Sequence, residues 1–171
     1  MESATAGHTL TERMIGAAKL QIWAFEEVEA DLTATGQAAI VVGIVAVAQA
    51  IGDMGAGSQG IIGGVLSAFF GWAVWSGVTY LVGTHIFKGT ADWGELLRTI
   101  GFAHAPGVLA VFGVIPVVGG LVRAVVAIWI LVAGIIAIRQ ALDFDTGRAI
   151  LTAVIGWLAL LIPMLILGGL F

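Results

Sequence analysis

Five long apolar runs, separated by short polar segments, constrain the fold of this chain more than any other feature. An apolar helix needs about 17 to 25 residues to cross the hydrocarbon of a bilayer. Hydrophobic residues make up 60% of the 171 residues and charged residues only 11%, too few to cover a globule in water. The sequence therefore predicts an all-α polytopic membrane helix bundle with five transmembrane helices. The predicted spans are 34–52, 60–87, 102–118, 121–138 and 150–171.

An amphipathic segment precedes the first span. Thr9 and Glu12 have the spacing of a capping box, and apolar residues then recur at helical intervals as far as position 32. We predict a cytoplasmic surface helix at 10–31, after a disordered polar lead at 1–9. The remainder, 32–171, is the five-span membrane domain.

A second amphipathic segment, at 90–101, interrupts the apolar runs. Thr90 is placed to cap a helix here, and Arg98 belongs to its polar face. The pattern predicts an interfacial helix that lies flat on the membrane. Its apolar face consists of Trp93, Leu96, Leu97 and Ile100.

The basic residues predict the orientation. Lys and Arg are enriched in cytoplasmic loops, and here they lie before the first span, between the second and third, and between the fourth and fifth. These three segments face the same side of a five-span protein. We expect a cell (cytoplasmic or inner) membrane location, with a cytoplasmic amino terminus and a carboxyl terminus on the outer side. The residues concerned are Arg13, Lys19, Lys88, Arg98, Arg139 and Arg148.

Arg123 is the basic residue that departs from this distribution, because it lies just inside the fourth span near the outer face. A guanidinium within a span costs about 3 kcal/mol unless it reaches the interface or a partner. We predict that Arg123 contacts Asp53 or a lipid phosphate and holds the hairpin of the third and fourth spans against the first loop. A chain of intramembrane carboxylates, which an ion or proton path needs, is absent from the sequence.

Acidic residues gather towards the end of the first surface helix, at Glu26, Glu27 and Glu29. Carboxylates interact unfavourably with the negative end of a helix dipole. They form either a solvated acidic rim or a docking face for basic residues of a neighbour or of this chain.

Small residues recur every fourth position in the second span, beginning with Gly60 and Gly64. This spacing allows a second helix to approach closely, either within the monomer or in a dimer. In the last span, Pro163 is expected to kink the helix.

The sequence offers little support for catalysis or cofactor binding. His85 and His104 are weak candidates for a haem or pigment ligand, because no third ligand recurs around them at helical spacing. The segment 143–147 lacks the ligands of a calcium loop, and no phosphate-binding loop or metalloprotease motif is present. We therefore predict no enzyme activity, no metal and no cofactor. A net charge of −4 with scattered basic residues argues against nucleic acid as a partner.

Three short motifs resemble those of the prokaryotic branch of the Yip-domain family, five-span membrane proteins related to Ypt/Rab-interacting proteins. The motifs are Asp31–Gln37, Glu95–Arg98 leading to Gly101–Pro106, and Arg139–Leu142 with Thr146–Ala149. The resemblance implies a multi-pass protein without catalytic residues that organises membranes or membrane partners. The Asp-Leu-Tyr-Gly-Pro type segment of eukaryotic members is absent, so Rab binding is not carried over.

Two functions remain open at this point. The first is a non-catalytic scaffold or accessory subunit that recognises other membrane proteins, or a second copy of itself, through its cytoplasmic face. The alternative is a small transporter, or a lipid-handling or pigment-binding subunit, which requires a polar or ligand-filled cavity among the spans.

Overall fold

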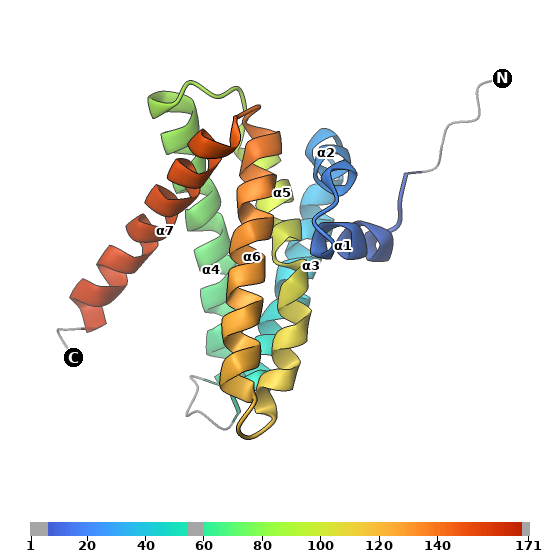
Figure 1. Cartoon of the computed structure of the whole chain (residues 1–171), viewed down its shortest axis with the longest axis vertical. Helices are drawn as coiled ribbons and strands as arrows, with labels where there is room; N and C mark the ends of the chain where they lie inside the picture. The colour runs from blue at the N-terminus through green and yellow to red at the C-terminus, as the bar shows by residue number, and fades with distance from the viewer. Residues whose placement is uncertain (1–6, 55–59, 169–171) are drawn as a thin grey trace.

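The computed structural model describes residues 7–54 and 60–168, the segment 160–168 by its backbone alone. Over these residues every regular element is a helix, which confirms the predicted all-α class (Figure 1). The elements are α1 (Leu10–Ala18), α2 (Ile22–Ala30), α3 (Ala34–Gly52), α4 (Gly60–Leu81), the π-helix η1 (Val82–Ile86), α5 (Trp93–Ala103), the 3-10 helix η2 (Ala105–Val114), α6 (Gly119–Ala141) and α7 (Thr146–Gly168).

Four segments in the described part of the chain are long and apolar enough to cross a membrane. They are Ala34–Gly52, Gly60–Ile86, Trp93–Val114 and Gly119–Ala141. The first has the predicted bounds, and the second and fourth differ from the predicted ones by a few residues. A shorter apolar helix, Thr146–Ala159, occupies the start of the predicted fifth span. The surroundings of Pro163 in α7, and residues 169–171, lie outside the side chains described.

The predicted surface helix at 10–31 is wrong in its continuity, because the structure breaks it into α1 and α2. Leu20 lies at the break with φ of 60°, in the left-handed region. The amide of Gln21 donates to the carbonyl of Gly16, which closes α1 with a reversed turn. Glycine usually occupies such a position, so the sequence contains no ordinary signal for this break.

The predicted flat helix at 90–101 is also wrong in its placement. Asp92, and not Thr90, caps α5 by accepting from the amide of Glu95. The helix then continues through His104 directly into η2, so both belong to one membrane-length segment. Part of its supposedly polar face is buried as well, since Arg98 is only 3% exposed and Thr99 is fully buried. The physical reason is that α2, α3, α4 and α6 surround α5 and leave no broad face for the headgroups.

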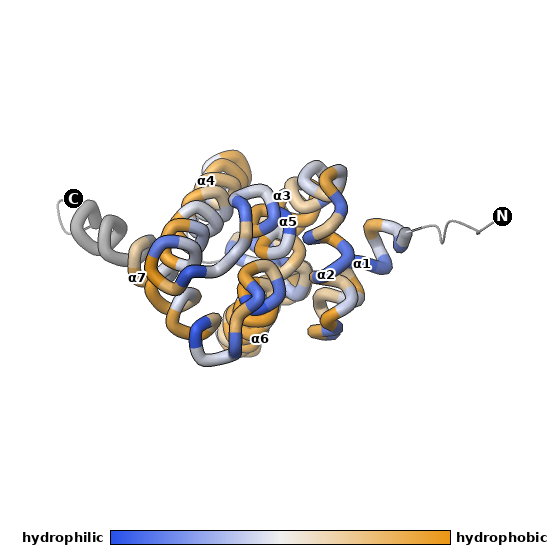
Figure 2. Tube along the Cα trace, turned by 90° about the horizontal axis from the view of Figure 1, so that it is seen from above, coloured by the Kyte–Doolittle hydropathy of each residue, from blue (hydrophilic) through white to orange (hydrophobic). Residues whose placement is uncertain are grey.

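The bundle core contains many small residues, while many of the large apolar side chains point outward. Ala38, Ala133 and Ala137 are fully buried, whereas Ile62, Phe70 and Leu121 are exposed. Small residues allow helix backbones to approach closely, which is how helices associate where lipid surrounds them. Figure 2 shows the resulting distribution, with hydrophobic stretches along α4, α6 and α7 and hydrophilic residues on the short helices and connections.

The two ends of the bundle differ. In Figure 1, α2, the connection from η1 to α5 and the turn between α6 and α7 lie towards one end, and the turn between η2 and α6 lies at the other. The short helix α1 lies at one side of the bundle and packs against α2, η2 and α5. At its end, the indole Nε1 of Trp129 on α6 donates to the carbonyl of Ala18 at 2.8 Å. This bond satisfies one of the free carbonyls at the end of α1.

Candidate functional site

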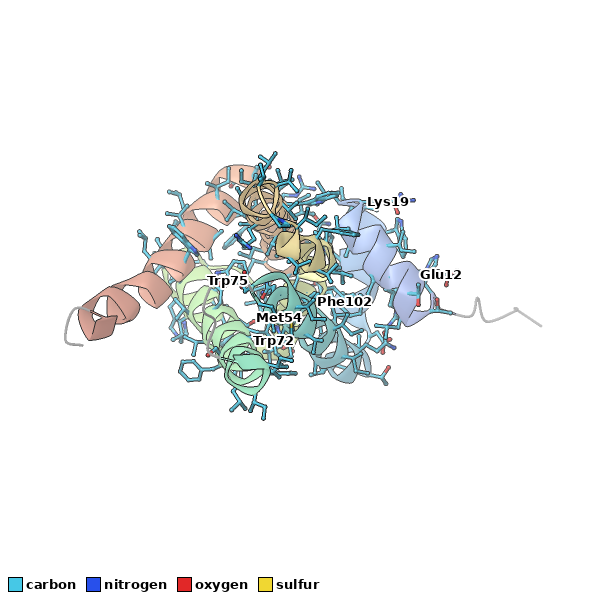
Figure 3. All side chains as sticks on the ribbon, turned by 90° about the horizontal axis from the view of Figure 1, so that it is seen from below. Glu12, Lys19, Met54, Trp72, Trp75 and Phe102 are labelled. Carbon is cyan, nitrogen blue, oxygen red and sulfur yellow. The ribbon has the colours of Figure 1, made fainter. Side chains whose placement is uncertain are left out.

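One cavity lies between α3, α4, η2 and α6 and opens to the outside of the bundle. Its volume is about 450 Å³, within the range of roughly 300 to 1,000 Å³ that is usual for ligand pockets. Trp72 and Trp75 of α4 project towards this cavity, as Figure 3 shows, whereas Glu12 of α1 and Lys19, directly after α1, point away from it. The remaining walls are mostly aliphatic, but four side chains capable of hydrogen bonding also line the cavity: Gln49, Asp53, His104 and Arg123.

Arg123 and Asp53 form one end of this cavity. Nη1 of Arg123 lies 3.4 Å from Oδ1 of Asp53, so the contact predicted from the sequence is present. The same nitrogen donates to the carbonyl oxygens of Gly113 at 3.1 Å and Gly52 at 3.3 Å. The two charged side chains are 42% and 41% exposed. The pair therefore joins α3, η2 and α6 and still presents both charges outside the packed core.

His104 lies between α5 and η2, and its side chain lines the inner part of the cavity. Its Nδ1 is 2.7 Å from the carbonyl oxygen of Ile100. A carbonyl only accepts hydrogen bonds, so Nδ1 carries a proton here. The ring meets Trp75 edge to face, with 6.0 Å between centroids. His104 is thus held rigidly at the cavity wall.

A second cavity, of about 510 Å³, adjoins the first one between α4, α6 and α7. Four residues line both cavities: Trp75, His104, Ala127 and Ile130. The rest of its lining is apolar and includes exposed side chains such as Ile128 and Trp157. The second cavity therefore continues the first towards an apolar surface of the bundle.

A polar layer formed by α1, α2 and the start of α3 is the second notable feature. Arg13 is 5% exposed and is bound by Oε1 of Glu27 at 2.9 Å, Oδ2 of Asp31 at 2.8 Å and Oε1 of Gln37 at 3.0 Å. His8 also contacts the Glu27 carboxylate, although the sequence placed it in a disordered lead. These bonds stabilise the Arg13 cation within the protein, because a buried charge needs partners.

These contacts change the pKa values of the acidic groups in the polar layer. Burial alone would raise the pKa of Glu27, but hydrogen bonds from His8 and Arg13 outweigh it and hold the pKa below its ordinary value. Hydrogen bonds from Thr33 and Arg13 likewise lower the pKa of Asp31. Both carboxylates therefore remain ionised in the folded protein at neutral pH.

Arg98 ties the same layer to α5. It donates to the carbonyl oxygens of Val28 at 3.0 Å and Glu29 at 2.6 Å, in the last turn of α2. A cation at this position offsets the negative end of the helix dipole and satisfies free carbonyls. Arg98 therefore compensates for the carboxylates that made the end of this helix unfavourable in the sequence.

The three acidic candidates have different roles. Glu27 binds Arg13, and the exposed Glu26 accepts from the amide of Gln140 on α6 at 3.1 Å. Glu29 is partly buried, which raises its pKa, and the nearby carboxylates of Glu95, Asp143 and Glu26 raise it further. Glu26 and Glu27 therefore bind residues of this chain.

The other predicted site residues do not join the cavity. His85 is exposed on η1 and its Nδ1 lies 2.9 Å from the hydroxyl of Thr84, so the structure does not place it beside His104 in the cavity lining. Leu96 is buried in the core, Leu97 is partly buried and Trp93 is half-exposed. No described atom outside α4 would contact a Cβ at Gly60 or Gly64, so these glycines do not serve close packing within the described monomer. Among the residues that the structure describes, no group of three His, Cys, Asp or Glu side chains could hold a metal.

Sequence reasoning missed the roles of Arg13, Gln37, Gln49 and Trp75. Each lies in an amphipathic or apolar segment whose local pattern shows only that a helix forms. Gln37 and Gln49 carried a signal, because an amide inside an apolar span is unusual. The partners of the others come from distant segments and depend on how the helices pack.

A protein-family model described as the Yip1 domain matches residues 23–167. The match begins in α2 and extends almost to the end of α7, and so it covers most of the chain. No curated protein and no solved structure matches this chain.

Proposed function

The chain belongs to the Yip1 domain family, and from this premise we propose that it is a non-catalytic scaffold or accessory subunit of the membrane. It is a multi-pass membrane protein, and its family is generally without catalytic activity. The proposed role is to hold membrane partners through the face formed by α1, α2 and the start of α5. The observation that best supports the proposal is that two buried arginines, Arg13 and Arg98, bind this face to the rest of the bundle.

The contacts of these two arginines support a role in the recognition of partner proteins. Arg13 fixes α1 to α2 and α3, and Arg98 fixes α2 to α5. Charged groups are costly to bury, so two buried arginines in a small protein favour one specific arrangement of this face. A surface that is ordered before binding loses less entropy when a partner binds. The carboxylate of Glu26, which also accepts from Gln140, remains exposed on this face for contacts with a basic partner.

The experiment changes the exposed carboxylate of Glu26 and leaves the contact of the buried Arg13 with Glu27 intact. Proteins that co-purify with the chain in mild detergent are quantified for the wild type, Glu26→Lys and Asp145→Lys. The two variants carry the same charge change, and Asp145 lies outside α1, α2 and α5, in the turn before α7, where it accepts from the amide of Arg148. Unfolding midpoints of both variants are measured as well, because each variant also removes a hydrogen bond within the chain. A partner that is lost only with Glu26→Lys supports the proposal. Identical recovery with all three forms contradicts it.

The proposed placement is a cell membrane with five crossings, a cytoplasmic amino terminus and the carboxyl terminus on the opposite side. The support is the distribution of Lys and Arg together with α7 as the fifth crossing. Tags at the two ends, probed from each side with an impermeant reagent, test this placement. Accessibility of both tags from one compartment would contradict it.

A second candidate function, lipid handling, is favoured by the cavities between α3, α4, η2, α6 and α7. A bundle made only to hold partners has no need of two adjoining cavities of ligand size. The measurement is the amount of lipid that remains bound to the purified protein after extensive washing. This candidate requires bound lipid that a cavity-filling substitution removes.

A further inference from the structure

We propose that the adjoining cavities bind a zwitterionic phospholipid, with its headgroup at the Arg123–Asp53 pair and one hydrocarbon chain directed past His104 towards α7. This inference rests on the lipid-handling candidate and adds to it the class of lipid, the position of the headgroup and the path of the chain.

The charged pair of Arg123 and Asp53, at one end of the first cavity, determines which headgroup fits there. Arg123 and Asp53 lie 3.4 Å apart and both remain nearly half-exposed. A phosphate suits the guanidinium, and a primary or quaternary ammonium suits the carboxylate. A headgroup that carries both charges satisfies both residues together, whereas an anionic headgroup brings a negative charge close to Asp53.

The polarity of the cavity walls sets the direction of the lipid. The first cavity contains Gln49, Asp53 and Arg123 towards one end, where ester and phosphate oxygens find hydrogen-bond donors. The second cavity is lined almost entirely by apolar side chains, including Leu131, Val154 and Leu158. This gradient from polar to apolar matches a molecule with a polar head and a hydrocarbon tail.

Ala127 lies at the junction of the two cavities. It lines both of them, with Trp75 and His104 from the opposite side. Its methyl group is small enough to leave the passage open, and an indole at this position would fill it. Ala124 lies on the same helix, is also exposed and lines neither cavity, so it offers a matched control.

The test uses the full chain in nanodiscs of equal amounts of phosphatidylethanolamine and phosphatidylglycerol. After transfer to mild detergent and washing, mass spectrometry measures each lipid that remains per protein. We expect the wild type to retain severalfold more phosphatidylethanolamine than phosphatidylglycerol. Ala127→Trp should lose this lipid and Ala124→Trp should keep it.

Asp53→Asn gives the sharper readout, because it leaves Arg123 as an uncompensated cation at the mouth. The preference should then shift towards phosphatidylglycerol, a change that mere structural damage does not produce. Arg148→Gln removes an arginine far from the cavity and should leave the preference unchanged.

The possible failures are distinguishable. In one outcome, the wild type retains lipid and Ala127→Trp loses it, but the wild type shows no headgroup preference or prefers phosphatidylglycerol. This outcome overturns the zwitterionic assignment and leaves lipid handling in place. Retention that is equal in the wild type and Ala127→Trp, or absent from both, overturns the site and the lipid-handling candidate together.

Discussion

Arg98 donates to the carbonyl oxygen of Glu29 at 2.6 Å, across 69 positions of the sequence. The bond brings a buried cation to the negative end of α2, where it offsets the helix dipole beside a carboxylate. It also decides where α5 lies, since the arginine faces protein and not the headgroups.

Replacing Arg98 should destabilise the protein. Arg98→Met keeps much of the side-chain volume but leaves the carbonyls of Val28 and Glu29 without their donor. A hydrogen bond to a charged group contributes about 1.5 to 3 kcal/mol, so we expect a loss of at least that size. Thermal unfolding in detergent, followed by tryptophan fluorescence, measures the change. Arg148→Met, at an exposed arginine, should lower the midpoint far less; an equal effect would refute the assigned role.

Glu27→Gln should loosen α1 and remove part of the pH dependence of stability. The folded pKa of Glu27 is below its ordinary value of 4.5. As pH falls through this region the unfolded chain binds the proton first, so the stability from Glu27 is present at neutral pH and is lost in acid. Hydrogen exchange in α1 between pH 7 and 4 measures this effect. The variant should start with less protection and should change less on acidification.

Glu29→Gln should have the opposite sign. Burial and neighbouring carboxylates raise the pKa of Glu29, so ionised Glu29 opposes folding at neutral pH. The variant should therefore unfold at a higher temperature than the wild type at pH 7. The difference should shrink as pH falls through the raised pKa, where the wild-type side chain becomes neutral. A lower midpoint at pH 7 would contradict the assigned environment.

Gly52→Ala should be strongly destabilising, because its Cβ would lie 2.0 Å from the backbone carbonyl oxygen of Ala110. Backbone cannot move aside as a flexible side chain does, so the cost should be about 3 kcal/mol or more. Gly64→Ala is the matched control, since nothing outside its helix lies within 4 Å of the added methyl. Alanine is the better helix former by about 1 kcal/mol, so this variant should be neutral or stabilising. Unfolding midpoints of both variants check the pair.

Val117→Gly should stabilise the turn between η2 and α6. Val117 has φ of 71° and its side chain is fully exposed, at 102%. The left-handed conformation costs a residue other than glycine about 1 to 2 kcal/mol, and the exposed side chain returns little. We expect a gain of about 1 kcal/mol after the extra entropy of glycine in the unfolded chain. Val118→Gly, at φ of −91°, should instead reduce stability.

Local chemistry was enough to predict part of the fold and site. The bounds of α3 followed from the length of an apolar run, because lipid requires a nearly fixed number of helical residues. The contact of Arg123 with Asp53 followed from the cost of an unpaired cation within a span. By contrast, the pattern at 90–101 correctly indicated a helix but misplaced it, since periodicity identifies an apolar face without identifying what covers it.

The sequence alone thus determined that the chain is helical, that lipid surrounds it and roughly where its spans lie, because these properties depend on the hydropathy of consecutive residues. Only the tertiary structure decided that Leu20 divides the first amphipathic segment, that Arg98 reaches α2 and that Trp75, Ala127 and His104 meet at the junction of two cavities. Those features arise where surfaces distant in sequence come into contact, and the free energy of such contacts is not contained in any single segment.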